Sequence, residues 1–281
     1  MPAALEFFEE QSDVVVRELS PLGFFYITTP LTGNVNPMRS RKQPITSRYS
    51  NAERAEDMDI KAVLFDLDGT LLNRDASLVF FVRDQYDRFS QLQLVEKDIF
   101  VRRFIELDNH GYVWKDKVYQ QLIDEFSIQD IEWTELLGDY LISFQRHCIG
   151  FPNMITMLTQ LKNNGVKLAL ISNGYGQFQY DNFKALGISH LFDEVLISEW
   201  EGLRKPNPEI FIRALSKLGV RAEDALFVGD HPENDIRASR DVGIKAVWKR
   251  NKQFLSEVDA DAIINDLEEL TQYALRSNGK R

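Results

Sequence analysis

Short apolar runs and longer amphipathic segments alternate through most of the chain. The apolar runs have the length and composition of strands buried on both faces of a parallel sheet, and they lie at residues 62–65, 167–172, 194–197, 225–229, 245–248 and 262–264. Helical segments follow most of them, at residues 152–164, 177–186, 208–218, 233–241 and 266–275. This alternation predicts an α/β fold, a doubly wound parallel sheet with helices on both faces.

A purely helical pattern interrupts the alternation after the first strand. From residue 76 to about residue 148, apolar residues recur at steps of three and four and no strand pattern occurs. We therefore expect an all-helical insert at residues 76–148, entered through residues 73–75. The core domain would then consist of residues 58–75 and 149–281.

The first 57 residues differ from the rest of the chain. Residues 19–29 could form a short strand, but residues 36–57 are polar and contain Pro37 and Pro44. We expect residues 1–57 to be a poorly ordered N-terminal extension. Either the folded domain does not need it, or it is a small docking element.

Composition restricts the class of protein. The chain has 281 residues and a formal net charge of -10, which argues against binding to nucleic acid or to an anionic membrane. Its one cysteine, Cys148, excludes an internal disulfide and a multi-cysteine metal site. No apolar stretch approaches the roughly 20 residues of a membrane-spanning helix. We expect a cytoplasmic protein, a monomer or a homodimer.

Acidic and polar residues follow several of the predicted strands. Asp66 and Asp68 come directly after the first strand, and two like charges so close repel unless a cation or a bound proton intervenes. Ligands of doubly wound sheets bind at the carboxyl ends of the strands, at the switch point in strand order. The other candidates at these ends are Ser172, Asn173, Gly174, Lys205, Asp230 and Asp235. Oxygen ligands of this kind suit magnesium (Mg²⁺), and the set is typical of phosphoryl transfer.

These residues also form an ordered set of motifs. Asp66-Leu67-Asp68-Gly69-Thr70, Ser172-Asn173-Gly174, Lys205-Pro206 and Gly229-Asp230 with Asp235 resemble the four motifs of the haloacid dehalogenase-like (HAD) hydrolase superfamily. The resemblance covers about residues 59–250, and the helical insert is similar to the superfamily's C1 cap. It implies a Rossmann-like core and a Mg²⁺-dependent phosphatase.

The resemblance implies a catalytic role for three residues. Asp66 would be the nucleophile that forms an aspartyl-phosphate. Asp68 would protonate the leaving oxygen and later accept a proton from water, and its backbone carbonyl would be a metal ligand. Lys205 would offset the charge gathered on the nucleophile and the phosphoryl group.

The resemblance also implies which residues bind the metal and the phosphate. Asp230 would hold Mg²⁺ beside the nucleophile, with Asp235 supporting the metal site. Ser172 and the amide of Asn173, in the turn with Gly174, would bind phosphate oxygens.

Other interpretations of the same residues stay open. The dehalogenase branch lacks an aspartate at the position of Asp68, so this residue favours phosphate esters. A phosphotransferase or mutase of the beta-phosphoglucomutase kind would keep both aspartates, and a non-catalytic binding module is the third alternative. His231 occupies a variable position of its motif. Trp114 and Lys115 could contact a ring-bearing substrate, although Trp114 could equally be packing inside the insert.

The predicted substrate is a small phosphorylated metabolite. The motifs around Ser172 and residues 197–200 resemble those of phosphatases that act on nucleotides or sugar phosphates. Hydrolysis of such a phosphomonoester is therefore the predicted activity.

Overall fold

The computed structural model describes residues 60–254 and 258–275. The predictions for the N-terminal extension, residues 1–57, and for a strand at 19–29 lie outside the described residues. Six strands form one parallel sheet in the order β3-β2-β1-β4-β5-β6. Their bounds are β1 Ala62–Phe65, β2 Lys167–Ser172, β3 Glu194–Ile197, β4 Ala225–Gly229, β5 Lys245–Lys249 and β6 Ala262–Ile264. The predicted doubly wound parallel sheet is confirmed.

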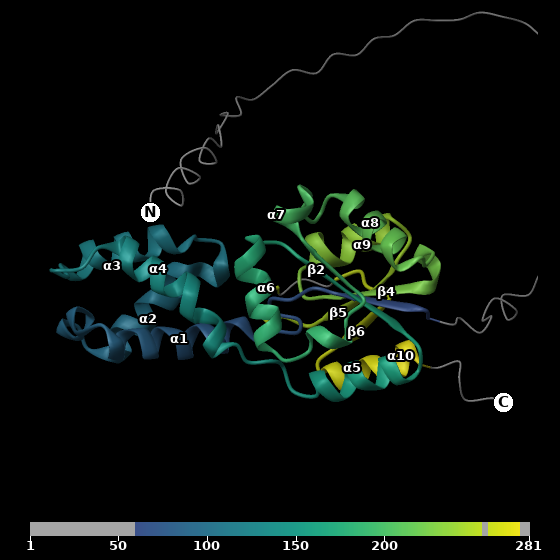
Figure 1. Ribbon diagram of the computed structural model, residues 1–281, viewed down its shortest axis with the longest axis horizontal. Coiled ribbons are helices and arrows are strands. Elements are labelled where there is room, and N and C mark those ends of the chain that lie inside the picture. Colours follow the sequence, from purple (N-terminus) through teal and green to yellow (C-terminus); the bar gives the residue numbers. More distant parts are fainter. Residues whose placement is uncertain (1–59, 255–257, 276–281) are drawn as a thin grey trace, which may run out of the picture. The chain divides into compact units, whose positions relative to one another are not determined.

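Helices cover both faces of this sheet (Figure 1). Side chains alternate along β1, so that Val63 and Phe65 join one buried cluster and Ala62 and Leu64 join another. The helices of the first face are α5 Met154–Asn163, α6 Gly176–Ala185 and α10 Leu270–Ala274. Those of the second face are α8 Pro208–Leu218 and α9 Ala238–Asp241, and a short helix α7, Ser198–Glu201, follows β3. Burial of β1 on both faces explains its unbroken apolar run.

The helix predicted at residues 233–241 is only partly an α-helix. It begins as a π-helix, Pro232–Arg237, and continues as α9. The carbonyl of His231 accepts hydrogen bonds from the amides of both Asp235 (3.0 Å) and Ile236 (3.3 Å), which widens the first turn. Asp235, a predicted site residue, therefore lies within a π-helix and not within an α-helix.

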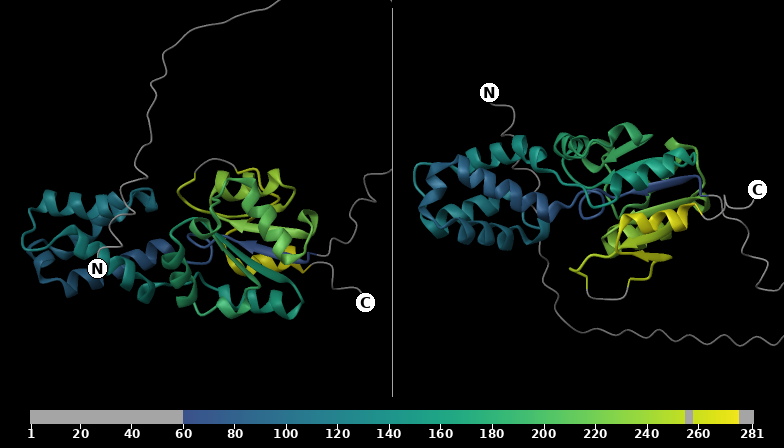
Figure 2. Two further views of the ribbon diagram at one scale, coloured as in Figure 1. Left: turned by 45° about the horizontal axis from the view of Figure 1, so that its top comes forward. Right: turned by 90° about the horizontal axis from the view of Figure 1, so that it is seen from below.

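Between β1 and α5, four α-helices pack against one another as a bundle, as Figures 1 and 2 show. They are α1 Arg74–Arg88, α2 Lys97–Asp108, α3 Lys115–Phe126 and α4 Trp133–Ser143. Helix α1 begins earlier than expected because Asn73 caps it, its Oδ1 accepting from the Ala76 amide at 3.2 Å. The insert is all-helical, as expected, while the boundaries of the predicted domains stay predictions.

Three helix ends of the insert meet at a buried ion cluster. Asp108, at the end of α2, accepts two hydrogen bonds of 2.9 Å from the guanidinium of Arg74 at the start of α1. It also accepts from the ammonium of Lys115 at the start of α3. Burial lowers the pKa of Lys115 to about 8 although Asp108 opposes this shift. Because Lys115 is buried and bonded to Asp108, its position does not support the suggested contact with a ring-bearing substrate.

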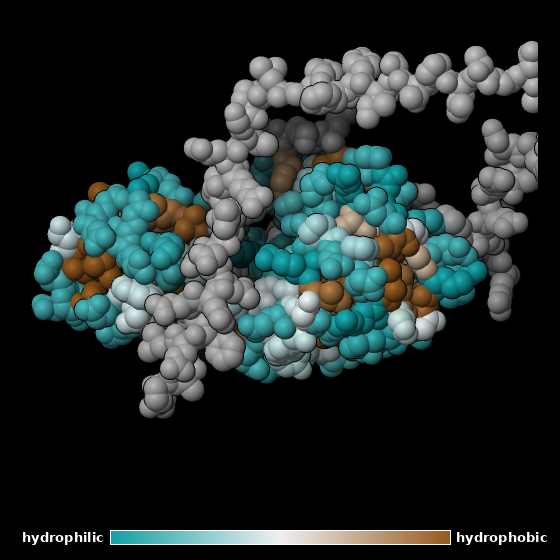
Figure 3. Space-filling model, turned by 90° about the horizontal axis from the view of Figure 1, so that it is seen from above, coloured by the Kyte–Doolittle hydropathy of each residue, from teal (hydrophilic) through white to brown (hydrophobic). Residues whose placement is uncertain are grey.

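The face of the described residues that Figure 3 shows is mostly hydrophilic. Seen from above, hydrophobic side chains are exposed in separate places among polar ones (Figure 3). Among the described residues, no helix combines the length and the apolar character needed to cross a membrane.

Candidate functional site

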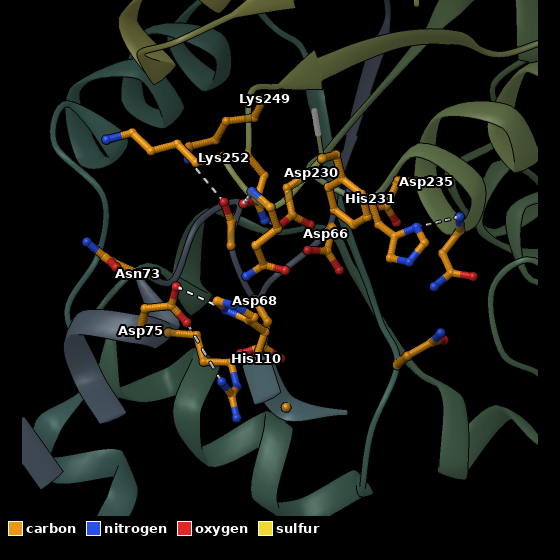
Figure 4. Close-up of a pocket in the computed structure, with 18 of the residues that line it drawn as sticks. Asp66, Asp68, Asn73, Asp75, His110, Asp230, His231, Asp235, Lys249 and Lys252 are labelled. Carbon is orange, nitrogen blue, oxygen red and sulfur yellow. Dashed lines mark hydrogen bonds and ion pairs between the residues drawn. The ribbon is translucent and has the colours of Figure 1, made fainter. Parts of the chain in front are cut away.

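The candidate site lies at the carboxyl end of β1. This is the switch point of the sheet, because the chain continues to β2 on one side of β1 and later to β4 on the other side. Asp66 follows β1 directly, and its amide donates to the Val228 carbonyl of β4 at 2.9 Å. A cavity of about 480 Å³ opens here. Figure 4 shows Asp66 near its centre, with Asp230 and Asp235 beside it. The predicted location of the site is the one that open α/β sheets use.

Three buried carboxylates meet at this point. Asp66, Asp230 and Asp235 each offer an oxygen atom, and these atoms lie within 4.8 Å of one another. The ammonium of Lys205 lies between two of them, 2.6 Å from Asp66 Oδ1 and 2.7 Å from Asp235 Oδ1. Residues from three separate segments of the sequence are therefore joined in one buried cluster.

The cluster carries more negative charge than Lys205 offsets. Burial, together with the charges of Asp235 and Asp68, raises the pKa of Asp66 to about 7 despite the opposing effect of Lys205. Burial and the nearby Asp66 also raise the pKa of Asp230. Burial disfavours the charge of Lys205, but Asp235 and Asp66 outweigh it and raise its pKa. A divalent cation would relieve this excess.

The oxygen atoms of the cluster differ in what they already bind. Asp235 accepts from Lys205 through Oδ1 and from the His231 amide through Oδ2, at 3.0 Å. Asp66 Oδ2 and Asp230 Oδ1, by contrast, accept no hydrogen bond from any of the described residues. The donor set therefore fits a hard cation such as Mg²⁺, with Asp66 and Asp230 as ligands and Asp235 in support.

Gly69 allows the loop after β1 to approach this cluster. Its φ is +81°, and an added Cβ would lie 2.0 Å from Asp230 Oδ2. A side chain at this position would both strain the backbone and collide with a carboxylate.

Asp68 lines the same cavity but is held from another side. Its Oδ2 accepts a 2.6 Å hydrogen bond from Nε2 of Gln179, a buried side chain on α6. The same amide nitrogen lies 2.9 Å from Ser172 Oγ. The side chain of Asp68 is thus not part of the carboxylate cluster, and the metal contact expected of its backbone carbonyl stays a prediction.

The predicted phosphate-binding turn follows β2. Ser172 ends the strand and is buried, whereas Asn173 lines the cavity. The Asn173 side chain donates to the Lys205 carbonyl and accepts from the Lys205 amide, both at 2.9 Å. The amide of Gly174 donates to Ser198 Oγ at 2.9 Å. The turn therefore fixes the position of Lys205, and its contacts with phosphate stay predictions.

The insert contributes one loop to the cavity. His110, Gly111 and Tyr112 line it, and the Tyr112 hydroxyl lies 3.4 Å from His231 Nε2. Trp114 instead packs against Tyr140 of α4, inside the insert, and against Tyr175, which precedes α6, with ring centroids 6.4 Å and 4.7 Å apart. The alternative interpretation of Trp114 as a packing residue fits this position.

Several residues around the site were not anticipated from the sequence. Gln179 lies on a helix where its burial follows from the packing of α6 against the sheet. Asn251 donates to Asp230 Oδ2 at 2.7 Å, and Lys249 donates to the Gly69 carbonyl at 3.0 Å. The one signal for the last two was their position at the carboxyl end of a predicted strand.

The sequence is similar to those of known phosphatases. A glyceraldehyde 3-phosphate phosphatase from Methanopyrus kandleri is 41% identical over 104 residues, which cover 37% of this chain and 45% of the relative. A phosphoserine phosphatase from Thermus thermophilus is 32% identical over 135 residues, covering 48% and 54%. The chain thus spans about half the length of these curated relatives.

A solved structure and a family model cover more of the chain. The crystal structure of a HAD phosphatase from Thermococcus onnurineus is 29% identical with a TM-score of 0.54, covering 76% of this chain and 97% of that one. The family model described as haloacid dehalogenase-like hydrolase matches residues 63–249, which include all the predicted site residues. The chain belongs to the haloacid dehalogenase-like hydrolase family.

Proposed function

We propose that the protein hydrolyses a small phosphomonoester, with Asp66 as nucleophile. The observation that carries this proposal is the buried cluster at the end of β1, where Asp66 accepts a hydrogen bond from the ammonium of Lys205 and lies near the carboxylate of Asp230. A carboxylate held in this way is typical of covalent phosphoryl transfer. The phosphatases among the relatives support the same reaction class.

The reaction proceeds in two steps, formation of an aspartyl-phosphate and its hydrolysis. An oxygen of Asp66 attacks phosphorus while the bond to the leaving oxygen breaks, and Asp68 donates a proton to that oxygen. Water then attacks the aspartyl-phosphate and gives a proton to Asp68, which releases phosphate and restores Asp66. Lys205 offsets the negative charge on Asp66 in both steps.

The binding residues have supporting roles. Asp66, Asp230 and the Asp68 carbonyl would hold Mg²⁺, which when bound neutralises charge on the phosphoryl oxygens. Ser172 and the Asn173 amide would bind phosphate. The cavity has room for a small phosphorylated metabolite such as a sugar phosphate or a nucleotide.

Phosphate release from a panel of phosphomonoesters tests the proposal. With Mg²⁺ present, p-nitrophenyl phosphate and at least one metabolite should be hydrolysed, and a chelator should abolish the reaction. Asp66→Asn should remove the activity, whereas Asp98→Asn, at an exposed ion pair of the insert, should leave it unchanged. Circular dichroism would verify that both variants fold.

Two outcomes would contradict the proposal. Activity that persists in Asp66→Asn would exclude the assigned nucleophile. An isomer of a sugar phosphate formed in place of free phosphate would indicate a mutase.

A further inference from the structure

Most lysine and arginine side chains of the described residues form ion pairs, as expected in a chain with 43 acidic and 33 basic residues. Some have no carboxylate of the described residues within ion-pair distance, and four of these line the cavity of the candidate site. They are Arg204, Lys249, Arg250 and Lys252. Lys249 is buried and its ammonium donates to the Gly69 carbonyl, whereas Arg204, Arg250 and Lys252 are exposed and available for an anionic ligand.

Three of these cations lie close to one another in the chain. Lys249 ends β5, and Arg250 and Lys252 follow it with exposed side chains. We call these three residues the basic segment. In Figure 4, Lys249 and Lys252 lie on the same side of Asp66 as Asp230, whereas Asp75, in the first turn of α1, and His110 of the insert lie on the other.

Hydrogen bonds hold the basic segment beside the carboxylate cluster. Asn251, between its two exposed cations, donates to Asp230 Oδ2 at 2.7 Å and accepts from the Gln253 amide at 3.0 Å. The Arg250 amide donates to the Ile264 carbonyl of β6 at 2.8 Å. Lys249 is 4% exposed, with its ammonium 3.2 Å from the centre of the Phe151 ring. Arg250 and Lys252 line the same cavity as Asp66, so a ligand whose phosphate lies at Asp66 can present its other end to them.

We propose that the basic segment, through its exposed residues Arg250 and Lys252, binds a second anionic group of the substrate, a carboxylate or a second phosphate. Guanidinium and ammonium groups prefer these anions, and arginine can bind either one through two hydrogen bonds. An uncharged sugar or glycerol unit would leave the cations without a partner. This inference rests on the proposed phosphatase function and narrows its substrate class to phosphomonoesters with a further negative charge.

Two three-carbon phosphomonoesters provide a matched test. 3-Phosphoglycerate carries a carboxylate where glycerol 3-phosphate carries a hydroxymethyl group. The wild-type protein should hydrolyse 3-phosphoglycerate with the higher kcat/KM. The double variant Arg250→Gln, Lys252→Gln should lower the ratio of the two kcat/KM values about tenfold, since an exposed ion pair contributes up to about fivefold.

A matched control separates this effect from a general loss of charge. Arg102 is also an exposed arginine with no carboxylate partner among the described residues, but it lies on α2 and does not line the cavity. Arg102→Gln removes the same charge and should leave the ratio unchanged. Raising the salt concentration should reduce the wild-type ratio, because exposed charges are screened.

The outcomes distinguish this inference from the proposed function. If the double variant leaves the ratio of the two kcat/KM values at its wild-type value, whether or not the values themselves fall, the basic segment does not recognise a second anion. Wild-type hydrolysis of p-nitrophenyl phosphate would then show that the phosphatase proposal still stands. If the wild-type protein hydrolyses no phosphomonoester at all, the proposed function itself is wrong.

Discussion

The buried ion cluster of Arg74, Asp108 and Lys115 should contribute to the free energy of unfolding of the protein. Asp108 is 1% exposed and is the shared partner of Arg74 and Lys115, whose side chains are 15% and 2% exposed. Asp108→Asn keeps the shape of the side chain but leaves the buried Lys115 without an ion-pair partner among the described residues, and Arg74 with only its 3.9 Å pair to the exposed Asp75. Breaking a buried ion pair by removing one partner costs about 3–5 kcal/mol. Because asparagine can still accept a hydrogen bond, we expect the lower end, about 3 kcal/mol.

Urea unfolding followed by circular dichroism measures this loss as a lower midpoint. The control is Asp98→Asn, at a pair with Arg83 in which both side chains are largely exposed, and it should cost less than about 1 kcal/mol. Adding Lys115→Met to Asp108→Asn removes the cation that is left unpaired and should recover part of the stability. A loss in Asp108→Asn no larger than in the control would refute the electrostatic reasoning.

Two further predictions concern catalysis and pH. Gln179→Leu frees the proposed acid–base carboxylate, so kcat/KM for an alkyl phosphate should fall about tenfold or more, and that for p-nitrophenyl phosphate should fall less because its leaving group needs little protonation. Gln177→Leu, at an exposed glutamine of the same helix, is the control, and equal losses for both substrates would argue against positioning. Burial lowers the pKa of Lys115 from 10.5 to about 8, so the unfolded chain binds more protons between these values and stability should rise from pH 8 to pH 10. Urea midpoints for the wild type and Lys115→Met should therefore diverge over this range, and parallel profiles would contradict the assignment.

The strands, and the carboxylates that follow them, could be predicted from the sequence because their signals are local. An apolar run such as β1 must be buried on both faces, and a run that ends in Asp66 and Asp68 must deliver charge at the edge of the sheet. Since parallel strands end at one edge, the strand pattern predicts that Asp66 and Asp230 share this edge, and the pairing of β4 with β1 brings them close together. The cluster of Asp66, Asp230 and Asp235 agrees with that reasoning.

Tertiary packing, and not a local sequence pattern, determines which side chains hold these carboxylates in place. Gln177 and Gln179 cannot be told apart in the sequence, yet α6 packs so that one is exposed and the other bonds to Asp68. Lysine is usually exposed at the protein surface, but three helix ends converge around Lys115 and bury it with Asp108. The amphipathic and apolar patterns specify which face of an element is buried. Which polar group meets a given carboxylate depends on how the elements pack, and that information is spread over residues far apart in the chain.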